Sequence, residues 1–115
     1  MIFIIEDDLG WESYYRRLLK RQDLRFFQDG VAAIDAMDFD EPPSLVILDI
    51  LLTGPTGFAV LNEMRSYPEL MKVPVLIVSS VTLPTDVAEK YGVVAALDKG
   101  AMKPEDLLEV VKQYA

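Results

Sequence analysis

Short apolar runs alternate along the chain with segments in which apolar residues recur at helical spacing. The apolar runs predict strands over these ranges: 1–5, 24–27, 44–49, 73–78 and 93–97. The segments between and after them predict helices over these ranges: 9–21, 29–37, 58–66, 84–91 and 104–114. The predicted order is therefore a strand followed by a helix, repeated along the whole chain.

This alternation is typical of α/β proteins with a parallel sheet. Because the main strands are apolar at successive positions, they must be covered on both sides. We therefore predict one domain over 1–115, with a five-stranded parallel sheet and helices on both faces, a (βα)5 doubly wound fold of the flavodoxin-like kind. Right-handed crossovers bring the carboxyl ends of all strands to one edge, where such sheets bind ligands.

Composition narrows the possible chemistry. The 115 residues are 51% hydrophobic, which is enough for a real core, and they include no cysteine and no histidine. The chain therefore has no disulfide, thiolate metal site or Ser-His-Asp triad, and it cannot carry a phosphohistidine. Any metal must be held by oxygen ligands, which favours Mg²⁺, Ca²⁺ or Mn²⁺.

The charge balance limits the possible partners. Nineteen acidic residues against eleven basic ones give a net charge of -8, which disfavours binding to nucleic acid or to an anionic membrane. The apolar runs fall far short of the roughly 20 residues that span a bilayer. No basic stretch precedes the first apolar run, so it is not a signal peptide, and we expect a cytoplasmic location.

Polar residues stand at the carboxyl ends of the predicted strands. Glu6 and Asp7 follow the first strand, and Asp49 interrupts the otherwise apolar third run. Ser79 ends the fourth strand and Lys99 follows the fifth. One edge of the sheet is therefore expected to carry a carboxylate cluster, a hydroxyl and an ammonium group.

Such a cluster of carboxylates calls for a cation, or for protonation of one carboxyl. Two like charges 4 Å apart repel by about 4 kcal/mol at an effective dielectric constant near 20. Carboxylate ligands with little surrounding cage suit Mg²⁺, and a carboxylate beside Mg²⁺ can attack a phosphoryl group to give an acyl phosphate. Lys99 and a serine hydroxyl would bind the phosphoryl oxygens, so this transfer needs no histidine base.

In order and spacing, these residues resemble the receiver domain of two-component response regulators across nearly the whole chain. The segments that carry the resemblance are Ile4-Ile5-Glu6-Asp7-Asp8, Leu45-Val46-Ile47-Leu48-Asp49, Gly57, Val78-Ser79-Ser80 and Leu97-Asp98-Lys99. Each motif is weak by itself, and their joint order within five strand–helix units makes the match specific.

The resemblance implies roles for these residues. Asp49 would be the phosphoacceptor, Ser79 the switch hydroxyl and Lys99 the phosphate-binding lysine. Mg²⁺ would be held by Glu6, Asp7, Asp49 and the backbone carbonyl of Leu51. The donor would be a histidine kinase or a phosphotransfer protein, and the signal would pass to an output domain or a downstream protein. The chain would then be a phosphoacceptor signalling domain rather than an enzyme that turns over a substrate.

The sequence departs from the family pattern at four positions. Thr53 stands where the family usually has proline, and Thr56 precedes the loop glycine where an acidic or small residue is common. Ala96 occupies the usual aromatic switch position, and Gly100 follows the lysine in place of proline. These changes keep open a second interpretation, a degenerate receiver that serves as a phosphorylation-independent interaction module.

A third interpretation is a phosphohydrolase. The segment from Asp49 to Thr53 resembles the nucleophile motif of haloacid dehalogenases, but that motif has a second acid two residues on, where this chain has Leu51. The acidic turn after the first strand has a structural alternative as well, since Asp8 is a good helix N-cap. Trp11 is expected to make core or partner contacts rather than to bind a ligand.

Overall fold

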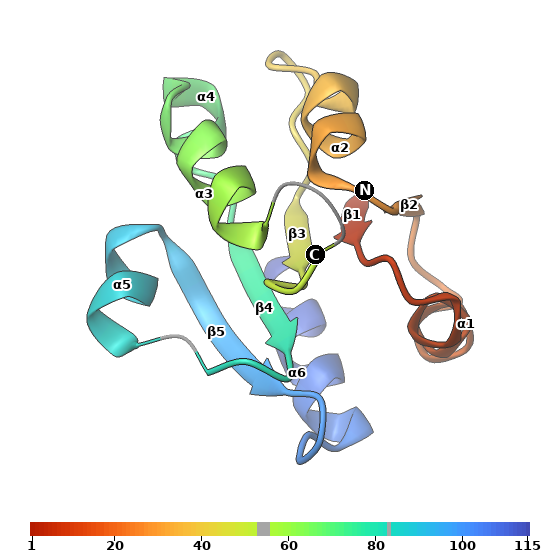
Figure 1. Cartoon of the computed structure of the whole chain (residues 1–115). Helices are drawn as coiled ribbons and strands as arrows, with labels where there is room; N and C mark the ends of the chain where they lie inside the picture. Colours follow the sequence, from red (N-terminus) through yellow and green to blue (C-terminus); the bar gives the residue numbers. More distant parts are fainter. Residues whose placement is uncertain (53–55, 83) are drawn as a thin grey trace.

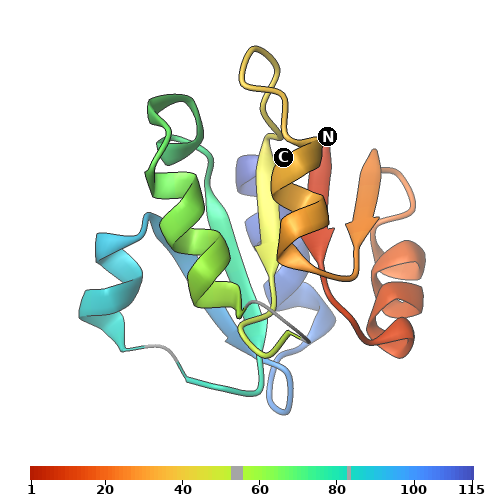
Figure 2. The same ribbon diagram turned by 45° about the horizontal axis from the view of Figure 1, so that its top comes forward.

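The computed structural model describes residues 1–52, 56–82 and 84–115. It contains one five-stranded parallel sheet in the order β2-β1-β3-β4-β5, with β2 and β5 at its edges (Figures 1 and 2). The strands are β1 (Ile2–Ile5), β2 (Leu24–Phe27), β3 (Leu45–Leu48), β4 (Val75–Ser79) and β5 (Val93–Asp98). The helices are α1 (Leu9–Leu18), α2 (Gly30–Ala36), α3 (Gly57–Arg65), α4 (Pro68–Met71), α5 (Thr85–Lys90) and α6 (Pro104–Tyr114). The predicted fold class is confirmed.

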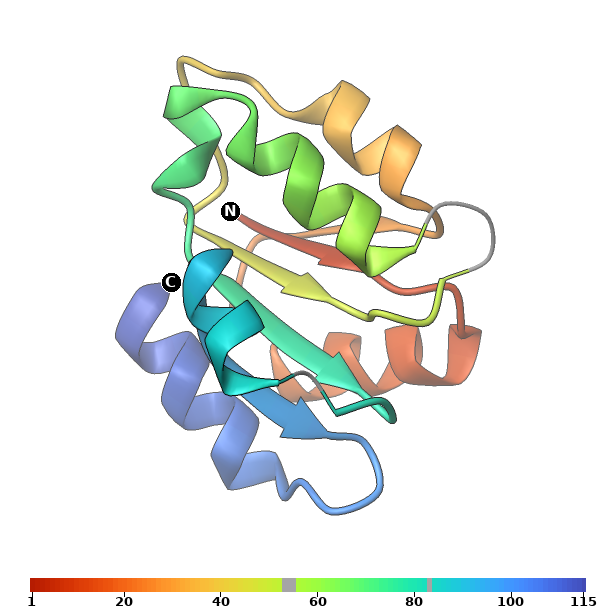
Figure 3. The ribbon, with the colours of Figure 1, turned by 60° about the vertical axis from the view of Figure 1, so that its left-hand side comes forward.

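Helices cover both faces of the sheet. Figure 3 shows α2 and α3 on one side and α1 and α6 on the other. Alternate residues of β1 explain this division, because successive strand side chains point to opposite faces. Phe3 and Ile5 belong to the core under α2 and α3, whereas Ile2 and Ile4 belong to the core under α1 and α6. The apolar runs of the sequence are thus strands that are buried on both sides.

The order in which successive strands join the sheet reverses between β1 and β3. From β1 it passes to β2 on one side, and it then returns to place β3 on the other side. Ligands of doubly wound sheets bind at the carboxyl edge near such a switch point. The residues that follow β1 and β3, Glu6 and Asp49, therefore lie where this topology favours a binding site.

The structure differs from the sequence prediction in local details. Helix α1 ends at Leu18 rather than at Arg21, because the chain turns there and the Gln22 amide donates to the Leu19 carbonyl at 2.9 Å. The single turn α4 is an addition, since four residues are too few to show a helical period. The expected turn over 53–57 lies partly outside the described residues, and Thr53 is among those that fall outside. No helix in the described part of the chain is long and apolar enough to cross a bilayer.

Gly57 allows the start of α3 to pack against the end of β3. A Cβ atom at this position would lie 2.6 Å from the Asp49 carbonyl oxygen and 2.7 Å from the Cα of Ile50. Both neighbours are backbone atoms, so the strand end itself would have to move. The glycine therefore sets how closely α3 approaches the loop that carries Asp49.

We expect Gly57→Ala to lower the free energy of unfolding by about 2 kcal/mol or more, the usual cost of forcing an atom into a packed interior. Urea unfolding followed by circular dichroism measures it. Ala59→Ser, at an exposed position of the same helix, is the control and should change the stability by less than about 0.5 kcal/mol. Equal stability of the two variants would contradict the close approach.

Candidate functional site

Strand register brings the predicted site residues to one edge of the sheet. Ile5 pairs with Leu48, so the following residues, Glu6 and Asp49, leave neighbouring strands side by side. The Asp49 amide donates to the Ile5 carbonyl at 3.1 Å, which holds the two chains together at this point. On the other side of β3, the Lys99 amide donates to the Ser79 carbonyl at 3.1 Å. Backbone hydrogen bonds between strands thus fix the main-chain positions of the four site residues, which are Glu6, Asp49, Ser79 and Lys99.

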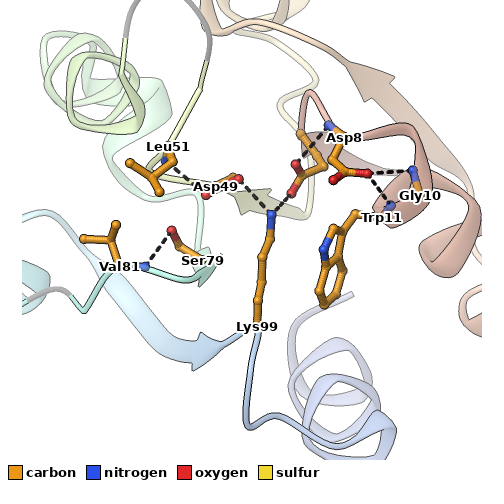
Figure 4. Close-up of polar contacts among 9 residues, drawn as sticks. Asp8, Gly10, Trp11, Asp49, Leu51, Ser79, Val81 and Lys99 are labelled. Atoms are coloured by element: carbon orange, nitrogen blue, oxygen red, sulfur yellow. Dashed lines mark hydrogen bonds and ion pairs between the residues drawn. The ribbon is translucent and has the colours of Figure 1, made fainter.

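Lys99 connects the two halves of the site. Its Nζ lies 2.9 Å from Asp49 Oδ2 and 2.7 Å from Glu6 Oε2 (Figure 4). The carboxylate side chains are only 5% and 2% exposed, and the lysine side chain is 14% exposed, so these ion pairs are shielded from water. Burial lowers the Lys99 pKa, but the two carboxylates outweigh that effect and leave the pKa above its ordinary value. The lysine therefore stays charged.

Glu6 is held in a less polar environment than an exposed carboxyl. Burial raises its pKa, the hydrogen bond from Lys99 lowers it, and the charge of Asp49 raises it again. The net direction is upward from the ordinary value. Its other oxygen accepts from the Asp8 amide at 3.1 Å. Glu6 is therefore a carboxylate that depends on a neighbouring cation for its charge.

Asp49 is fixed from two sides. Its Oδ1 accepts a hydrogen bond from the Leu51 amide at 3.0 Å, while Oδ2 accepts from Lys99. The residue is 5% exposed at the carboxyl edge of the sheet. A carboxylate held in this way keeps one orientation, which suits a group that must meet an incoming reactant along a defined direction.

Asp7 joins Glu6 and Asp49 in a group of acids. Each of the three offers a carboxylate oxygen, and these oxygens lie within 4.8 Å of one another. Glu6 and Asp49 are buried and Asp7 is half-buried, so the group is reachable from one side. Three oxygen donors at this spacing, in a chain without histidine or cysteine, fit a hard divalent cation such as Mg²⁺ or Mn²⁺. The carbonyl of Leu51 as a further ligand stays a prediction.

Ser79 lies on the β4 side of the site (Figure 4). The residue is 1% exposed, and its Oγ accepts from the Val81 amide at 3.3 Å. A hollow of about 90 Å³ next to it is lined in part by Ala96, at the position where the sequence departs from the family pattern. The hydroxyl is therefore buried beside a small hollow that Ala96 helps to line.

Other predicted positions have structural roles. Asp8 caps α1, and its Oδ1 accepts from the amides of Gly10 at 2.7 Å and Trp11 at 3.3 Å. Asp8 therefore has the structural role, as a helix cap, that was the alternative for the acidic turn. It is not part of the acidic group of Glu6, Asp7 and Asp49. The Gly100 amide donates to Asp98 Oδ1 at 2.6 Å in the turn after β5. Thr56 precedes α3 as its N-cap without a side-chain hydrogen bond.

Trp11 makes one contact that the sequence did not predict. The Lys99 ammonium lies 5.0 Å from the centre of the Trp11 ring, which is a cation–π distance. The indole packs against the core under α1 and α6, as expected. It also lies at the edge of the charged site, which was not expected (Figure 4). Nothing in the spacing of the two residues, which come from α1 and from the end of β5, signals this contact.

Known proteins with similar sequences and structures agree on one family. A model of the response regulator receiver domain matches residues 2–112. The two-component response regulator ORR3 of Oryza sativa subsp. indica is 26% identical over 86 residues, which cover 73% of this chain and 66% of that protein. The chain therefore spans just under two thirds of the length of this relative.

Two solved structures show the same architecture. The Mn²⁺-bound form of the response regulator Rcp1 is 26% identical, with a TM-score of 0.75 over 97% of this chain and 88% of that one. The chemotaxis protein CheY4 of Vibrio cholerae is 19% identical, with a TM-score of 0.83 over 99% of this chain and 97% of that one. Because CheY4 is only 19% identical to this chain, the similarity between the two structures shows a shared fold and nothing more.

Removing the Lys99 charge should destabilise the protein in the absence of divalent cations. We expect Lys99→Met to cost about 3 kcal/mol near pH 8, because it leaves two buried carboxylates without their counter-ion. Urea unfolding in the presence of a chelator measures this loss. Lys72→Met, at an exposed lysine beyond α4, is the matched control and should cost less than about 0.5 kcal/mol.

The loss should also depend on pH. Without Lys99, the Glu6 pKa rises further, since the lysine lowers it in the wild type. A carboxyl with a raised folded-state pKa favours folding at low pH, and stability falls as the pH rises through that value. The cost of Lys99→Met should therefore be smaller near about pH 5 than near about pH 8. A loss independent of pH would show that Glu6 is not the group left uncompensated.

Proposed function

The chain belongs to the response regulator receiver domain family, and on this premise we propose that Asp49 accepts a phosphoryl group from a partner protein. The observation that supports this most directly is the position of Lys99, whose Nζ lies 2.9 Å from Asp49 Oδ2 at the carboxyl edge of the sheet. A cation at this distance is placed to bind the oxygens of a phosphoryl group that arrives at the carboxylate.

The proposed step is a direct displacement at phosphorus. A carboxylate oxygen of Asp49 forms a bond to phosphorus, while the bond between phosphorus and the donor's imidazole nitrogen breaks. The electron pair of that bond stays with the imidazole, which then takes up a proton from water. Because the Leu51 amide and Lys99 already orient Asp49, the residues supply positioning and positive charge, the main requirements of phosphoryl transfer.

The donor set for Mg²⁺ consists of oxygen atoms only. We propose that Glu6, Asp7 and Asp49 hold the ion, with the Leu51 carbonyl as an additional ligand. When bound, the ion neutralises negative charge on the carboxylates and on the transferred group. The Mn²⁺ reported for Rcp1, a structure 26% identical to this chain, supports a divalent cation in this fold.

A phosphohistidine donor must belong to a separate protein or a separate domain. This chain has no histidine, so a phosphohistidine donor has to come from a histidine kinase or a phosphotransfer protein. The net charge of -8 disfavours nucleic acid as a direct partner of this domain. We propose that the signal passes to an output domain or to a downstream protein, which makes this a signalling domain rather than an enzyme with turnover.

Ser79 is the proposed switch hydroxyl. It is buried on β4 and bonded to the Val81 amide, so a new hydrogen bond to a phosphoryl oxygen would pull on the chain that leads to α5. Such a two-state shift is the usual way in which a local charge changes a distant surface.

Ala96 favours a second candidate function. It supplies no aromatic ring to fill the 90 Å³ hollow beside Ser79, so the site lacks the usual means of passing movement to the β5 surface. The alternative is therefore an interaction module that works without phosphorylation. The two candidates differ in whether the acidic group binds Mg²⁺ and in whether Asp49 is modified.

Phosphorylation of Asp49 is directly testable. Incubation with acetyl phosphate and Mg²⁺ should add one phosphoryl group to the wild type, seen by intact-protein mass spectrometry, and Asp49→Asn should show none. Asp98→Asn, which changes another aspartate at the same edge, should be labelled like the wild type. A wild type without adduct, indistinguishable from Asp49→Asn, would refute the phosphoacceptor role.

Mg²⁺ binding can be measured separately. Because the single tryptophan, Trp11, lies beside Lys99, its fluorescence should respond as Mg²⁺ occupies the acidic group. Binding should also stabilise the fold, by about 2.7 kcal/mol at 100 times the dissociation constant. Asp7→Asn should weaken both responses and Asp98→Asn should keep them. No response at millimolar Mg²⁺ would favour the interaction module.

A further inference from the structure

A second feature lies between the carboxyl-terminal ends of α1 and α6. It is a hollow of about 550 Å³, here called the α1–α6 groove. Its apolar lining residues include Leu18, Leu19, Leu108 and Val111, and basic side chains also line it. The proposed phosphorylation chemistry uses none of them.

The groove lies beside the amino ends of the strands, whereas Asp49 lies at their carboxyl ends. Helix α1 starts beside the acidic group, where Asp8 caps it, and runs back toward the start of β1. The Ile2 amide donates to the Asp23 carbonyl at 2.8 Å, so the residues after α1 lie at the amino edge. Helix α6 likewise starts after the end of β5 and runs to the same edge (Figure 3). The groove is therefore separate from the carboxylate site.

The floor of the groove is apolar. Leu19 and Val111 are buried in the core between the sheet and these two helices. Leu18 is half-buried, and Leu108 is 41% exposed, although it is a large apolar side chain on a helix that otherwise packs against the sheet. Together they offer an apolar strip on which a partner's side chains can be buried.

The rim of the groove is basic. Lys20, Arg21 and Lys112 line it, and no lining residue has an acidic side chain. Among the residues that the structure describes, none of these three cations has a carboxylate within 4.0 Å. The chain as a whole carries nineteen acids against eleven bases. Three basic side chains without an ion pair among the described residues thus line one hollow of a strongly negative molecule.

We propose that the α1–α6 groove docks an acidic amphipathic helix of a partner protein. Apolar side chains at i and i+3 or i+4 would pack against Leu18 and Leu108, and flanking Asp or Glu would pair with Lys20, Arg21 and Lys112. The helix-in-groove mode needs both features, an apolar floor and a charged rim of opposite sign. Nucleic acid and anionic membranes fit less well, because the rest of the surface repels them.

The test uses the whole chain and a synthetic helix. The probe is a fluorescein-labelled peptide about 18 residues long, since shorter helices are marginal in water, with leucines at i, i+4 and i+7 flanked by glutamates. Binding is followed by fluorescence anisotropy. A peptide of the same composition, with the leucines spread around the helix, controls for charge alone.

Two double variants separate the groove from the net charge. Lys20→Glu with Lys112→Glu reverses two rim charges, and Lys72→Glu with Lys90→Glu reverses two exposed charges elsewhere. We expect saturable binding to the wild type, weakened at least about tenfold by the rim variant and less than about twofold by the control. Leu108→Ser should also weaken binding, while lowering the melting temperature by no more than a few degrees, since Leu108 is 41% exposed.

Other outcomes would overturn the proposal. No saturable binding to the wild type, equal binding of the spread-leucine peptide, or equal weakening by both double variants would each remove the groove as the site. Sedimentation that shows a dimer abolished by Leu108→Ser would assign the groove to a second copy of the chain. Binding to vesicles containing phosphatidylserine, without binding to the peptide, would assign it to a membrane. Each of these measurements is independent of whether Asp49 accepts a phosphoryl group.

Discussion

The arrangement of this protein depends on one interaction, the pairing of Lys99 with Glu6 and Asp49. Two carboxylates from neighbouring strands end up buried at the same edge, and a third acid, Asp7, lies with them. Carboxylates brought together in a poorly solvated place repel one another unless a cation is present. The lysine, delivered by the last strand, supplies that cation and so allows the acidic edge to exist in a folded chain.

The sequence predicted the fold and the positions of the main site residues, but it did not predict all of the contacts between them. The continuous apolar runs around Ile4 and Ile47 allowed only strands covered on both sides, and the topology followed from the alternation with helices. Because parallel strands end at one edge, the position of Glu6, Asp49 and Lys99 followed as well. The sequence could not predict contacts between side chains of different elements, since no period or spacing connects Trp11 to Lys99.

The positions at which helices begin and end were also only partly predictable from the sequence. The basic residues after Leu19, Lys20 and Arg21, are compatible with a last helical turn, and only the turn bond from Gln22 to Leu19 shows that the helix has already ended. The single turn at Pro68 carries too few residues for a pattern. By composition alone, the acidic turn after β1 fits either a metal site or a helix cap. The structure separates these roles, because Asp8 caps α1 and lies outside the acidic group. Backbone hydrogen bonds thus settle what residue types leave open.

The parallel order of the strands has a consequence for how the protein assembles. The two residues joined by the central ion pair, Asp49 and Lys99, are 50 positions apart. Joining residues so far apart costs loop-closure entropy, and folds rich in such contacts fold slowly. A chain in which β1 and β3 have paired but β5 has not yet docked therefore holds its acids face to face without their internal counter-ion. Docking of the last strand both completes the sheet and relieves that repulsion, so the charges of the site are balanced only when the fold is complete.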